Sequence, residues 1–482
     1  MDNDIYVTTS IPYVNGRPHV GFALELVQAD AVARYHRLAG RSVRLQTGTD
    51  ENAFKNVQAA QQQGVTTAAL VEHNAEAFRA LSEALDIGFD SFVRTTQDGH
   101  RQAVTALWQA LRPGDVYRRA YEGLYCSGCE DFYLARDLSQ GLCPEHGVAP
   151  QSVAESNYFF RLSAYGAQIE EALESGRIRV VPAKRRREVL AFVRRGLQDI
   201  SISRDAQRQQ GWGIAVPGDP SQVVYVWIDA LINYLTGFGF GQGEDWRSGW
   251  AEEVGKIHVI GKNVWKFHAV YWPALLLSAG LPLPNEIVVH GFLTEEGRKI
   301  SKSSGGSVDP LACIDQYGVD AVRYYLLRGV PPTDDGDFSL ERLGQLYTQD
   351  LRHGLGNVLR RLLALAARSN YRPHLSAAVP PAPEDYTEAL QRYQFDRALA
   401  SLWGVIDQIN RSIQIVEPWT LSALGQQEDL YRHLDGWFGA LYQIGYWLRP
   451  FLPRAAEEIC TALKAPSSTA APILFPVVED GP

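Results

Sequence analysis

The sequence predicts an α/β protein in which a long insertion splits one parallel sheet, followed by an all-α region. Two observations carry this prediction: a β-α-β pattern opens the chain, and strand and helix patterns of the same kind return near Ile257. From about Gly336 onward the apolar residues follow helical spacing, with a proline-rich link at Pro380–Pro383. The 482 residues exceed what one hydrophobic core usually supports, so several domains are expected.

The opening β-α-β pattern also indicates where a ligand would bind. The segment Ile5–Thr9 is rich in β-branched residues and predicts a strand, and apolar residues at helical spacing predict a helix over Gly21–Gly40. A second strand is expected at Val43–Thr47. Ligands of such units bind beyond the carboxyl ends of the strands, where the loops bearing His19 and Asp50 would lie.

The second half of the sheet is expected from a strand at Ile257–Ile260, a helix at Asn263–Ala279 and a strand at Ile287–His290. A cysteine cluster and a region of mixed pattern lie between the two halves. The predicted divisions are a first sheet half at 1–115, an insertion at 116–222, a second sheet half at 223–297, a mobile loop and linking segment at 298–335, and a helical domain at 336–482.

The composition excludes some classes of function. Hydrophobic residues make up 45% and charged residues 21% of the chain, which is typical of a soluble globular protein. The net charge of -9 argues against a general nucleic-acid coat, since Lys and Arg drive such binding, but it allows a local basic face. No apolar run of about 18 residues occurs, and the start Met1–Asp4 is acidic where a signal peptide would be basic. We therefore expect a cytoplasmic protein with no membrane partner.

Three of the five cysteines crowd into one short segment. Cys126 and Cys129 form one close pair, and Cys143 with His146 forms the other. Three thiolates and an imidazole at this spacing suit one tetrahedral Zn2+ ion per chain, and four protein ligands leave no open position for catalysis. The prediction is a structural zinc. The remaining cysteines, Cys313 and Cys460, stand alone and are expected to be small buried side chains.

Two segments could bind phosphate. His19-Val20-Gly21-Phe22 begins the first predicted helix, where N–H groups and the helix dipole favour an anion, although a surface or capping His is an alternative interpretation. Lys299-Ile300-Ser301-Lys302-Ser303 places two ammonium groups next to Gly305 and Gly306. Such a loop could close over a triphosphate and stabilise the charge on leaving pyrophosphate, or it could be an ordinary solvated loop.

Taken together, the order of these motifs resembles methionyl-tRNA synthetase, a class I aminoacyl-tRNA synthetase. The match covers almost the whole chain. Its motifs are Thr8–Tyr13, the His-x-Gly of His19 and Gly21, Thr47–Glu51, Gly196–Ser201, Tyr225–Ala230, Phe292-Leu293 and Lys299–Ser303.

The resemblance implies a split Rossmann-type catalytic domain with a zinc-binding insertion, followed by an all-α anticodon-binding helical bundle. It also implies an ATP-dependent ligase of protein biosynthesis that joins L-methionine to tRNA(Met) through a methionyl-adenylate, with Mg2+ accompanying ATP. His19, Lys299 and Lys302 would stabilise phosphate charge as the catalytic residues. The implied ATP-binding residues are His19, Gly21, Phe22, Gly261, Asn263, Lys299 and Lys302.

The same resemblance implies an amino-acid pocket, in which Asp50 would pair with the substrate ammonium group. The implied pocket residues are Ile11, Tyr13, Asp50, Trp227, Leu231, Tyr234, Val264, His268 and Trp272. Without the resemblance, the last three of these would be interpreted as one core-facing helical stripe. With it, an aromatic and aliphatic pocket suits an unbranched thioether.

The helical region carries the expected tRNA-reading residues. Asn357 and Arg361 lie four residues apart on one predicted helix face, and Trp419 follows Pro418. Amide and guanidinium groups can read base edges and an aromatic ring can stack on a base, so resemblance implies anticodon binding by these three residues. In an unknown helical bundle they would indicate a solvated face and a core Trp. A basic cluster, Lys184–Arg187 with Arg194 and Arg195, could approach the tRNA acceptor end or be a solvated face.

Three positions around the expected ATP site depart from the family pattern. Phe22 replaces a second His, Asn52-Ala53 replaces His-Gly, and Asn263 replaces Asp. Loss of one donor to transition-state charge typically costs on the order of 100 to 1000-fold in rate, so slow or altered adenylation is an open alternative.

Other functions stay open at this point. One is a paralogue that uses another amino acid or passes its adenylate to a small-molecule amine. Another is a non-catalytic tRNA-binding protein, against which the retention of Lys299 and Lys302 speaks. A zinc-ribbon nucleic-acid module is more distant. A monomer is expected.

Overall fold

The computed structural model of the chain describes residues 4–126, 131–133, 135, 138–144, 147–243, 245–295, 298–299, 308–375, 378–464 and 472–478. Its contacts divide the chain into two compact units, which are described separately. The first unit comprises residues 1–18, 42–80 and 89–289, and the second comprises 19–41, 81–88 and 290–482. The domain boundaries expected from the sequence stay predictions, since this division follows contacts and not chain order.

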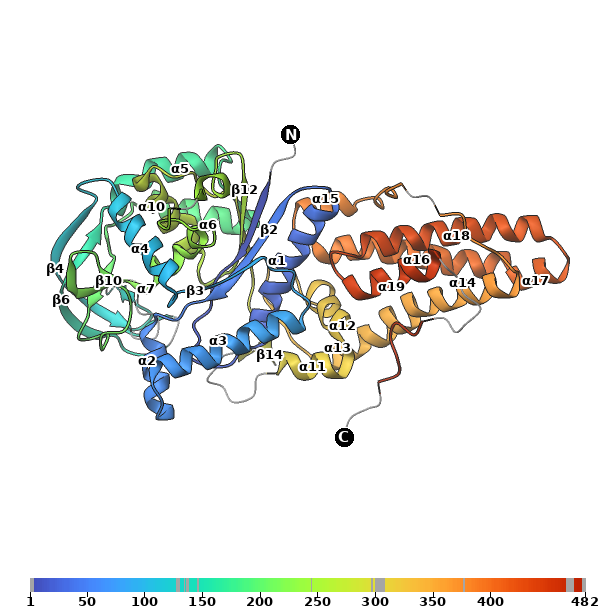
Figure 1. Cartoon of the computed structure of the whole chain (residues 1–482), viewed down its shortest axis with the longest axis horizontal. Helices are drawn as coiled ribbons and strands as arrows, with labels where there is room; N and C mark the ends of the chain where they lie inside the picture. The colour runs from blue at the N-terminus through green and yellow to red at the C-terminus, as the bar shows by residue number, and fades with distance from the viewer. Residues whose placement is uncertain are drawn as a thin grey trace. The chain divides into compact units, whose positions relative to one another are not determined.

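A six-stranded sheet forms the centre of the first unit (Figure 1). Its strands, in spatial order, are β3 (Ser91–Arg94), β2 (Val43–Thr49), β1 (Ile5–Thr9), β12 (Gly255–Gly261), β13 (Glu286–His290) and β7 (Arg179–Val181). Strand β1 pairs in parallel with β2 on one side, Ile5 opposite Val43, and with β12 on the other, Ile5 opposite Gly255. The prediction of one parallel sheet built from two separated parts of the chain is therefore confirmed.

Two strands of this sheet were not expected. Strand β3 pairs in parallel with β2, and β7, from the middle of the chain, pairs in parallel with β13. Both are short, and β7 carries only two β-branched residues, Val180 and Val181. Segments this short give no clear periodicity, which is why the sequence pattern did not reveal them.

The helices of the first unit lie before, between and after these strands. They are α2 (Phe54–Gln63), α3 (Thr67–Ala84), α4 (Asp98–Ala110), a 3-10 turn (Leu162–Tyr165), α5 (Gly166–Glu174), α6 (Ala183–Arg194), α7 (Val226–Leu231), α8 (Asn233–Thr236), α9 (Trp246–Gly249), a π-helical segment (Phe267–Tyr271) and α10 (Trp272–Ala279). Two small sheets complete the unit. Their strands are β5 (Asp131–Tyr133), β4 (Val116–Cys126), β6 (Gln151–Phe160) and β8 (Ile200–Ser201) in one, and β10 (Ala215–Val216), β11 (Asp219–Val224) and β9 (Ser203–Asp205) in the other.

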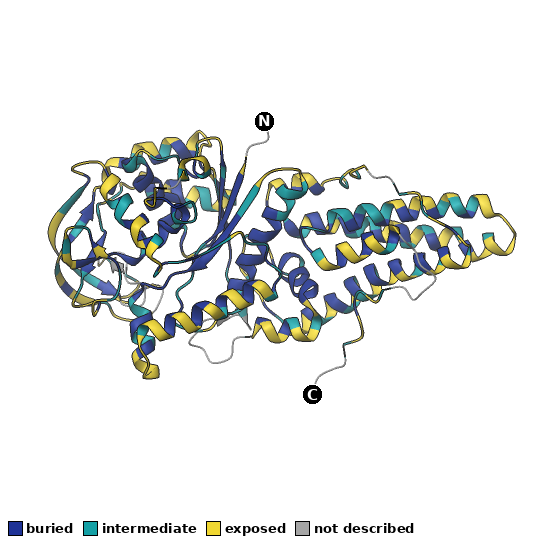
Figure 2. Ribbon diagram, viewed as in Figure 1, coloured by how far each residue is buried: buried dark blue, intermediate teal, exposed yellow. Residues whose placement is uncertain are grey.

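Burial of the central strands explains their composition. All five residues of β1 are buried, as are the last six residues of β12. Parallel strands covered on both faces are mostly apolar because neither face meets water. The buried polar side chains of β12 have partners: Lys256 Nζ donates to the Val254 carbonyl at 2.8 Å, and His258 Nδ1 lies 2.7 Å from Thr8 Oγ1. The core cluster of this unit includes Tyr6, Val180, Ile260 and Ile287, and Figure 2 shows the strands dark blue along their length.

The helix expected at Asn263–Ala279 differs from the prediction in its first half. Residues Phe267–Tyr271 form a π-helical segment, and only Trp272–Ala279 is regular α-helix. The helix ends at Gly280, whose φ of +67° is a left-handed conformation that glycine adopts at little cost. A π-helical segment widens the turn, so positions four residues apart no longer stack one above the other.

The second unit is mainly helical. Its helices are α1 (Val20–Leu38), α11 (Pro310–Tyr317), α12 (Val319–Tyr324), a π-helical segment (Tyr325–Gly329), α13 (Leu340–Leu346), a second π-helical segment (Tyr347–Gly356), α14 (Asn357–Arg368), α15 (Tyr386–Gln391), α16 (Phe395–Val416), α17 (Pro418–Ala423), α18 (Gln427–Trp447) and α19 (Pro453–Lys464). A three-stranded sheet joins them, with strands β15 (Arg298–Lys299), β14 (Leu293–Glu295) and β16 (Gly336–Asp337).

Helices α14, α16, α18 and α19 lie side by side as a bundle (Figure 1). On α14 the buried residues are Val358, Leu359, Leu362, Leu363 and Ala366. This spacing places one apolar stripe toward the other helices, and Figure 2 shows the same division into buried and exposed faces along the bundle. The helical prediction for the carboxy-terminal region is confirmed.

A buried arginine fastens α1 to the other parts of the second unit. The Arg323 guanidinium is fully buried and lies 2.6 Å from Asp30 Oδ2 on α1. It also donates to the carbonyl oxygens of Leu85 and Phe451, at 3.1 and 2.8 Å. Removal of one partner from a buried pair of this kind leaves an uncompensated charge.

Among the residues described here, no helix combines the length and apolar character needed to cross a membrane.

Candidate active site

The loops that follow β1 and β2 bring Tyr13 beside Asp50. The Asp50 N–H donates to the Pro12 carbonyl at 2.9 Å, and Tyr13 and Asp50 form an isolated parallel bridge. Parallel pairing thus continues past the carboxyl ends of both strands. This is the edge at which ligands of parallel α/β sheets bind, and Asp50 is buried there.

Aromatic side chains extend from this point. The Tyr13 ring lies 5.6 Å from the Trp227 ring, and Trp227 stacks on Phe267 with centroids 4.1 Å apart and an interplanar angle of 8°. Trp227 comes from α7, whereas Phe267 belongs to the π-helical segment. Phe267 was missed by the sequence analysis, although its place directly before His268 in an aromatic-rich run was a usable signal.

Three further ring side chains, which with Tyr13, Trp227 and Phe267 form an aromatic wall, come from α8, the π-helical segment and α10: Tyr234, His268 and Trp272. The Tyr234 hydroxyl lies 2.6 Å from His268 Nε2, and the Tyr234 and Trp272 ring centroids are 6.0 Å apart. Among the predicted pocket residues, Ile11, Leu231, Tyr234, Val264, His268 and Trp272 are buried, and Tyr13 and Trp227 are half-buried. The structure therefore brings Tyr13 and Trp227 together beside Asp50, and it brings Tyr234, His268 and Trp272 together.

A second histidine lies under Tyr234. The Tyr234 ring stacks on His258 at 4.2 Å, and Thr8 Oγ1 lies 2.7 Å from His258 Nδ1. Burial, aided by the charges of His268 and Lys256, lowers the pKa of His258 well below its ordinary value. A neutral imidazole therefore supports the apolar character of this region.

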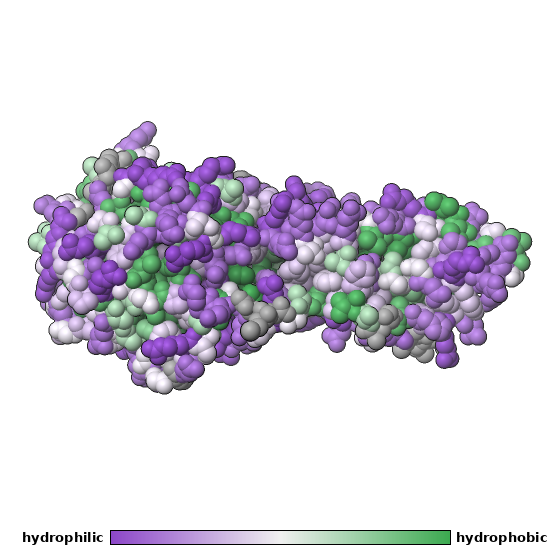
Figure 3. All heavy atoms as spheres, turned by 90° about the horizontal axis from the view of Figure 1, so that it is seen from above, coloured by the Kyte–Doolittle hydropathy of each residue, from purple (hydrophilic) through white to green (hydrophobic). Residues whose placement is uncertain are grey.

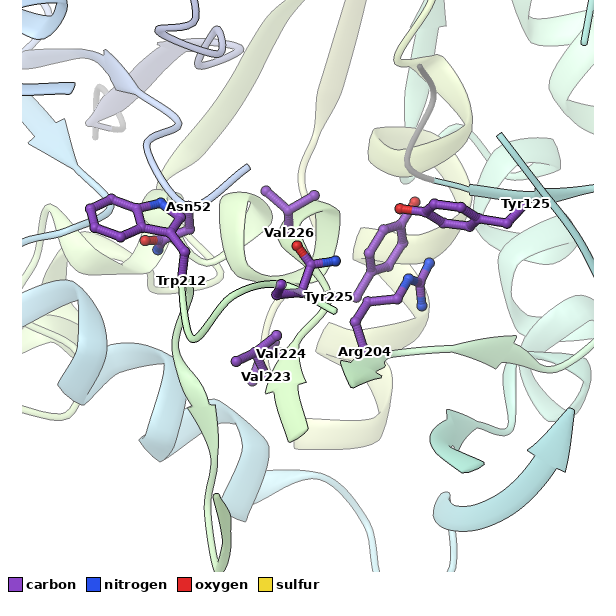
Figure 4. A pocket seen from close by; sticks show the side chains of 9 residues that line it. Asn52, Tyr125, Arg204, Trp212, Val223, Val224, Tyr225 and Val226 are labelled. Atoms are coloured by element: carbon purple, nitrogen blue, oxygen red, sulfur yellow. The ribbon is translucent and has the colours of Figure 1, made fainter. Parts of the chain in front are cut away.

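A shallow pocket lies next to the Asp50 loop. Asn52 and Trp212 lie on one side of it, and Arg204 and Tyr125 on the other (Figure 4). The Arg204 guanidinium carbon lies 3.8 Å from the Tyr225 ring centroid, and Trp212 Nε1 donates to the Glu51 carbonyl at 2.8 Å. Asn52 is thus a buried part of this region.

The predicted phosphate-binding residues at the start of α1 belong to the second unit. His19 is the N-cap of α1, and its Nδ1 accepts from the Gly21 N–H at 3.1 Å. A Cβ at position 21 would lie 2.9 Å from His19 Cε1, so a larger residue there would require the His19 ring to shift. Because Nδ1 accepts, the proton of a neutral His19 ring sits on Nε2. Phe22 is buried.

The other predicted ATP-binding residues are placed in part. Gly261 ends β12 in the first unit, and Asn263 is exposed in the turn after it. Lys299 lies on β15 of the second unit, with its backbone paired to Thr294. Lys302 lies outside the described residues.

Comparison with known proteins shows which family has this fold and sequence. The sequence profile described as tRNA synthetases class I (M) matches residues 5–152 and 146–363. A methionine–tRNA ligase of Brucella suis is 37% identical and covers 96% of this chain and 92% of its own length. The corresponding protein of Mycobacterium bovis is 39% identical, with 95% and 91% covered. The chain belongs to the methionyl-tRNA synthetase family.

Solved structures of the family agree with the fold. A crystal structure of Mycobacterium tuberculosis methionyl-tRNA synthetase bound by methionyl-adenylate is 38% identical and matches with a TM-score of 0.87. It covers 95% of this chain, which in turn covers 93% of it. The parallel-sheet domain and the helical region are thus those of a methionyl-tRNA synthetase.

The predicted zinc ligands are described only in part. Cys126 ends β4 and is buried. Cys143 is also buried, and its backbone carbonyl accepts from the Gly147 N–H at 2.8 Å. Cys129 and His146 lie outside the described residues. The lone cysteines Cys313 and Cys460 are both buried, as expected.

The predicted anticodon residues lie on the helical bundle of the second unit. Asn357 opens α14 and is exposed, and the Arg361 guanidinium carbon lies 5.9 Å from the Trp419 ring centroid. Trp419 is 52% exposed. Two apolar residues close to it in sequence, Ile415 and Leu424, are 82% and 68% exposed. Figure 3 shows hydrophobic atoms at the surface of the bundle. The structure brings Arg361 and Trp419 together and leaves the indole available for contact.

The basic cluster on α6 is largely paired with acids. Arg194 contacts Glu170 at 2.6 Å and also Glu174, and Arg185 contacts Glu188 at 2.6 Å. These partners neutralise two of the arginines in the cluster. The geometry favours a solvated face over a tRNA-binding one for Arg185 and Arg194.

Proposed function

We propose that the chain is a methionine–tRNA ligase, which activates L-methionine with ATP and transfers it to tRNA(Met). The observation that carries this proposal is the aromatic wall beside Asp50, in a chain of the methionyl-tRNA synthetase family. A buried carboxylate next to aromatic rings offers a charge partner for an ammonium group and an apolar surface for a thioether. We assign the pocket to Ile11, Tyr13, Asp50, Trp227, Leu231, Tyr234, Val264, His268 and Trp272.

In the first step the carboxylate of methionine attacks the α-phosphorus of ATP, and pyrophosphate leaves with the electron pair of the broken P–O bond. The product is methionyl-adenylate, and Mg2+ accompanies ATP. Asp50 holds the ammonium group, so the carboxylate is oriented before attack. No covalent enzyme intermediate is needed, because positioning and charge stabilisation suffice for this displacement.

His19, Lys299 and Lys302 are our candidates for stabilising the phosphate charge. The proton of a neutral His19 ring sits on Nε2, which makes this atom the donor to a phosphate oxygen. Gly21 permits close approach of the backbone at the start of α1, and Gly261 with Asn263 would contact the nucleotide from the end of β12. Phe22 supplies no hydrogen-bond donor at the position where the family pattern has His.

In the second step a hydroxyl of the terminal adenosine of tRNA attacks the acyl carbon of the adenylate, and AMP leaves. Binding of the anticodon is assigned to Asn357, Arg361 and Trp419. An exposed indole with a guanidinium over its ring is an arrangement that can stack on an unpaired base.

We also propose one structural Zn2+ ion, held by Cys126, Cys129, Cys143 and His146. The buried thiols of Cys126 and Cys143 fit this role. A closed four-ligand site would stabilise the local fold and take no part in the reaction. A monomeric state and a cytoplasmic location stay predictions from the sequence.

Pyrophosphate exchange with the purified chain tests the proposal. We expect methionine-dependent exchange of labelled pyrophosphate into ATP, with the other standard amino acids well below it. Exchange with a different amino acid would overturn the substrate assignment. No exchange with any amino acid would overturn the enzymatic proposal and favour a tRNA-binding protein.

A further inference from the structure

The buried carboxylate of Asp229 on α7 accepts a hydrogen bond from Asn52 in the loop that carries Asp50, although the two residues are 177 positions apart in sequence. Asn52 Nδ2 donates to Asp229 Oδ2 at 2.7 Å, and His100 Nε2 lies 2.6 Å from Asp229 Oδ1. Asp229 and His100 are both 0% exposed, and Asn52 is 8% exposed. A buried carboxylate with two short contacts is a strong restraint, because each contact replaces water that the carboxylate has lost.

The Asn52 side chain also fixes its own loop. Its amide donates to the Thr95 carbonyl at 3.1 Å, and the hydroxyl of the same Thr95 accepts from the Glu51 N–H at 2.8 Å. Asn56 Nδ2 donates to the Glu51 carbonyl at 2.8 Å. The backbone that carries Asp50 is therefore held from several directions, and Asn52 is its link to Asp229.

Asp229 lies on α7, between two residues assigned to the amino-acid pocket. Trp227 precedes it by two positions and Leu231 follows it by two. A short helix moves as one piece, so the Asn52 to Asp229 hydrogen bond sets how far Trp227 lies from the Asp50 loop. The ammonium group of a bound amino acid would contact Asp50, and its side chain would contact Trp227. The Asn52 to Asp229 hydrogen bond connects the two segments that carry these residues.

We propose that Asn52 and Asp229 are positioning residues for the amino acid. Their hydrogen bond sets the separation between the Asp50 carboxylate and the Trp227 wall, and so tunes affinity for an unbranched side chain. This inference rests on the proposed methionine pocket. It gives Asn52, a departure from the family pattern, a role on the amino-acid side of the site and not in phosphate binding.

An amide suits this position for a chemical reason. An Asn side chain has two N–H groups on one nitrogen, and here both are used, one by Asp229 and one by the Thr95 carbonyl. Asn52→Ala removes both bonds. Asn52→Asp sets a second carboxylate against Asp229, which is more disruptive, while the exchanged pair Asn52→Asp with Asp229→Asn restores an amide-to-carboxylate bond with its direction reversed.

Methionine binding to the ATP-free protein, measured by calorimetry, tests the proposal, with KM for methionine and for ATP from pyrophosphate exchange as a second readout. We expect Asn52→Ala to weaken methionine binding by about tenfold or more, since it removes the hydrogen bond to the Asp229 carboxylate together with the one to the Thr95 carbonyl. KM for ATP should stay within about twofold, because the bond acts on one substrate only. Asn52→Asp should weaken methionine binding further, and the exchanged pair should recover part of the loss, because it restores the bond between positions 52 and 229 but not the bond to the Thr95 carbonyl.

The matched control is Asn157→Ala. Asn157 is also fully buried, and its amide donates to Glu155 Oε2 at 2.8 Å within strand β6, which carries none of the assigned pocket residues. It should lower the melting temperature and leave methionine binding unchanged, which separates positioning from general destabilisation.

Three results would overturn the inference. They are unchanged methionine binding in a folded Asn52→Ala protein, an equal rise of KM for ATP, and an exchanged pair no better than Asn52→Asp. If the wild type binds methionine but supports no exchange, the proposed function fails while the binding series still decides the inference. If the wild type binds no methionine, both fail.

Discussion

The Tyr234 hydroxyl lies 2.6 Å from His268 Nε2, and the other ring nitrogen of His268 lies 3.0 Å from the Val264 carbonyl oxygen. A carbonyl oxygen only accepts, so Nδ1 carries the proton and donates to it. In the neutral ring Nε2 is then the acceptor for the Tyr234 hydroxyl, whose oxygen also lies 3.3 Å from the Thr9 carbonyl oxygen. The hydrogen-bond chain thus orients two side chains of the proposed pocket.

Tyr234→Phe tests this orientation. The substitution leaves buried His268 Nε2 without its donor, so we expect KM for methionine to rise about tenfold in pyrophosphate exchange, with a smaller change in kcat. Tyr386→Phe is the control, since this buried hydroxyl donates to the Trp447 carbonyl at 2.7 Å in the helical region. An unchanged KM in Tyr234→Phe would remove Tyr234 from the pocket.

Phe22→His tests whether the departure at the start of α1 limits the chemistry. A second imidazole there adds a donor for developing phosphate charge, so we expect kcat for exchange to rise by about tenfold or more. Phe22→Leu, which changes the side chain without adding a donor, should give no gain. An equal or lower rate in Phe22→His would show that this position does not limit adenylation.

Metal analysis of the purified chain tests the zinc proposal. We expect about one zinc per chain, because Cys126, Cys129, Cys143 and His146 make a closed ligand set. Cys143→Ser should lose the metal and unfold more easily, whereas Cys313→Ser, at another buried cysteine, should keep it. A zinc content far below one per chain in the wild type would contradict the assignment.

Trp419→Ala tests the proposed anticodon contact. Loss of a stacking ring typically weakens binding by about 1–3 kcal/mol per base, so kcat/KM for tRNA should fall by about tenfold or more. Pyrophosphate exchange should be unaffected, since it needs no tRNA. Half-buried Trp246, at the start of α9, lies outside the bundle, and Trp246→Ala serves as the control. Equal charging by Trp419→Ala and wild type would rule out the contact.

The stability of the folded chain should depend on His36. Burial, together with the Arg41 charge, lowers the pKa of His36 from 6.5 to about 4. The unfolded chain therefore binds the extra proton first, so this contribution is fully present above pH 6.5 and is lost as the pH falls toward 4. His36→Gln should reduce the loss between pH 7 and 4.5 by about 1 kcal/mol, measured by urea unfolding. A parallel pH dependence in both proteins would contradict this.

Much of the fold follows from local sequence. Strand β1 is five buried residues in a row, and α14 has a clear apolar stripe, so periodicity was sufficient for both. Strand β7 was missed because three residues carry no pattern, and its place beside β13 depends on tertiary pairing.

The site was less accessible to sequence reasoning. The motif resemblance supplied Asp50 and Trp227, but not Phe267, whose stacking on Trp227 depends on a π-helical segment. It also gave Asn52 a place near the nucleotide, because sequence order alone does not show a contact with Asp229 across 177 residues. Long-range side-chain contacts of this kind require the folded structure.

Charging of tRNA(Met) is the most direct test of the central claim that this chain is a working methionine–tRNA ligase. Purified chain, ATP, Mg2+ and labelled methionine would be incubated with elongator and initiator tRNA(Met), and acid-precipitable label measured over time. We expect both tRNAs to be charged with methionine and an unrelated tRNA to remain uncharged. Exchange of pyrophosphate without charging of either tRNA(Met) would contradict it and indicate a different acceptor for the adenylate.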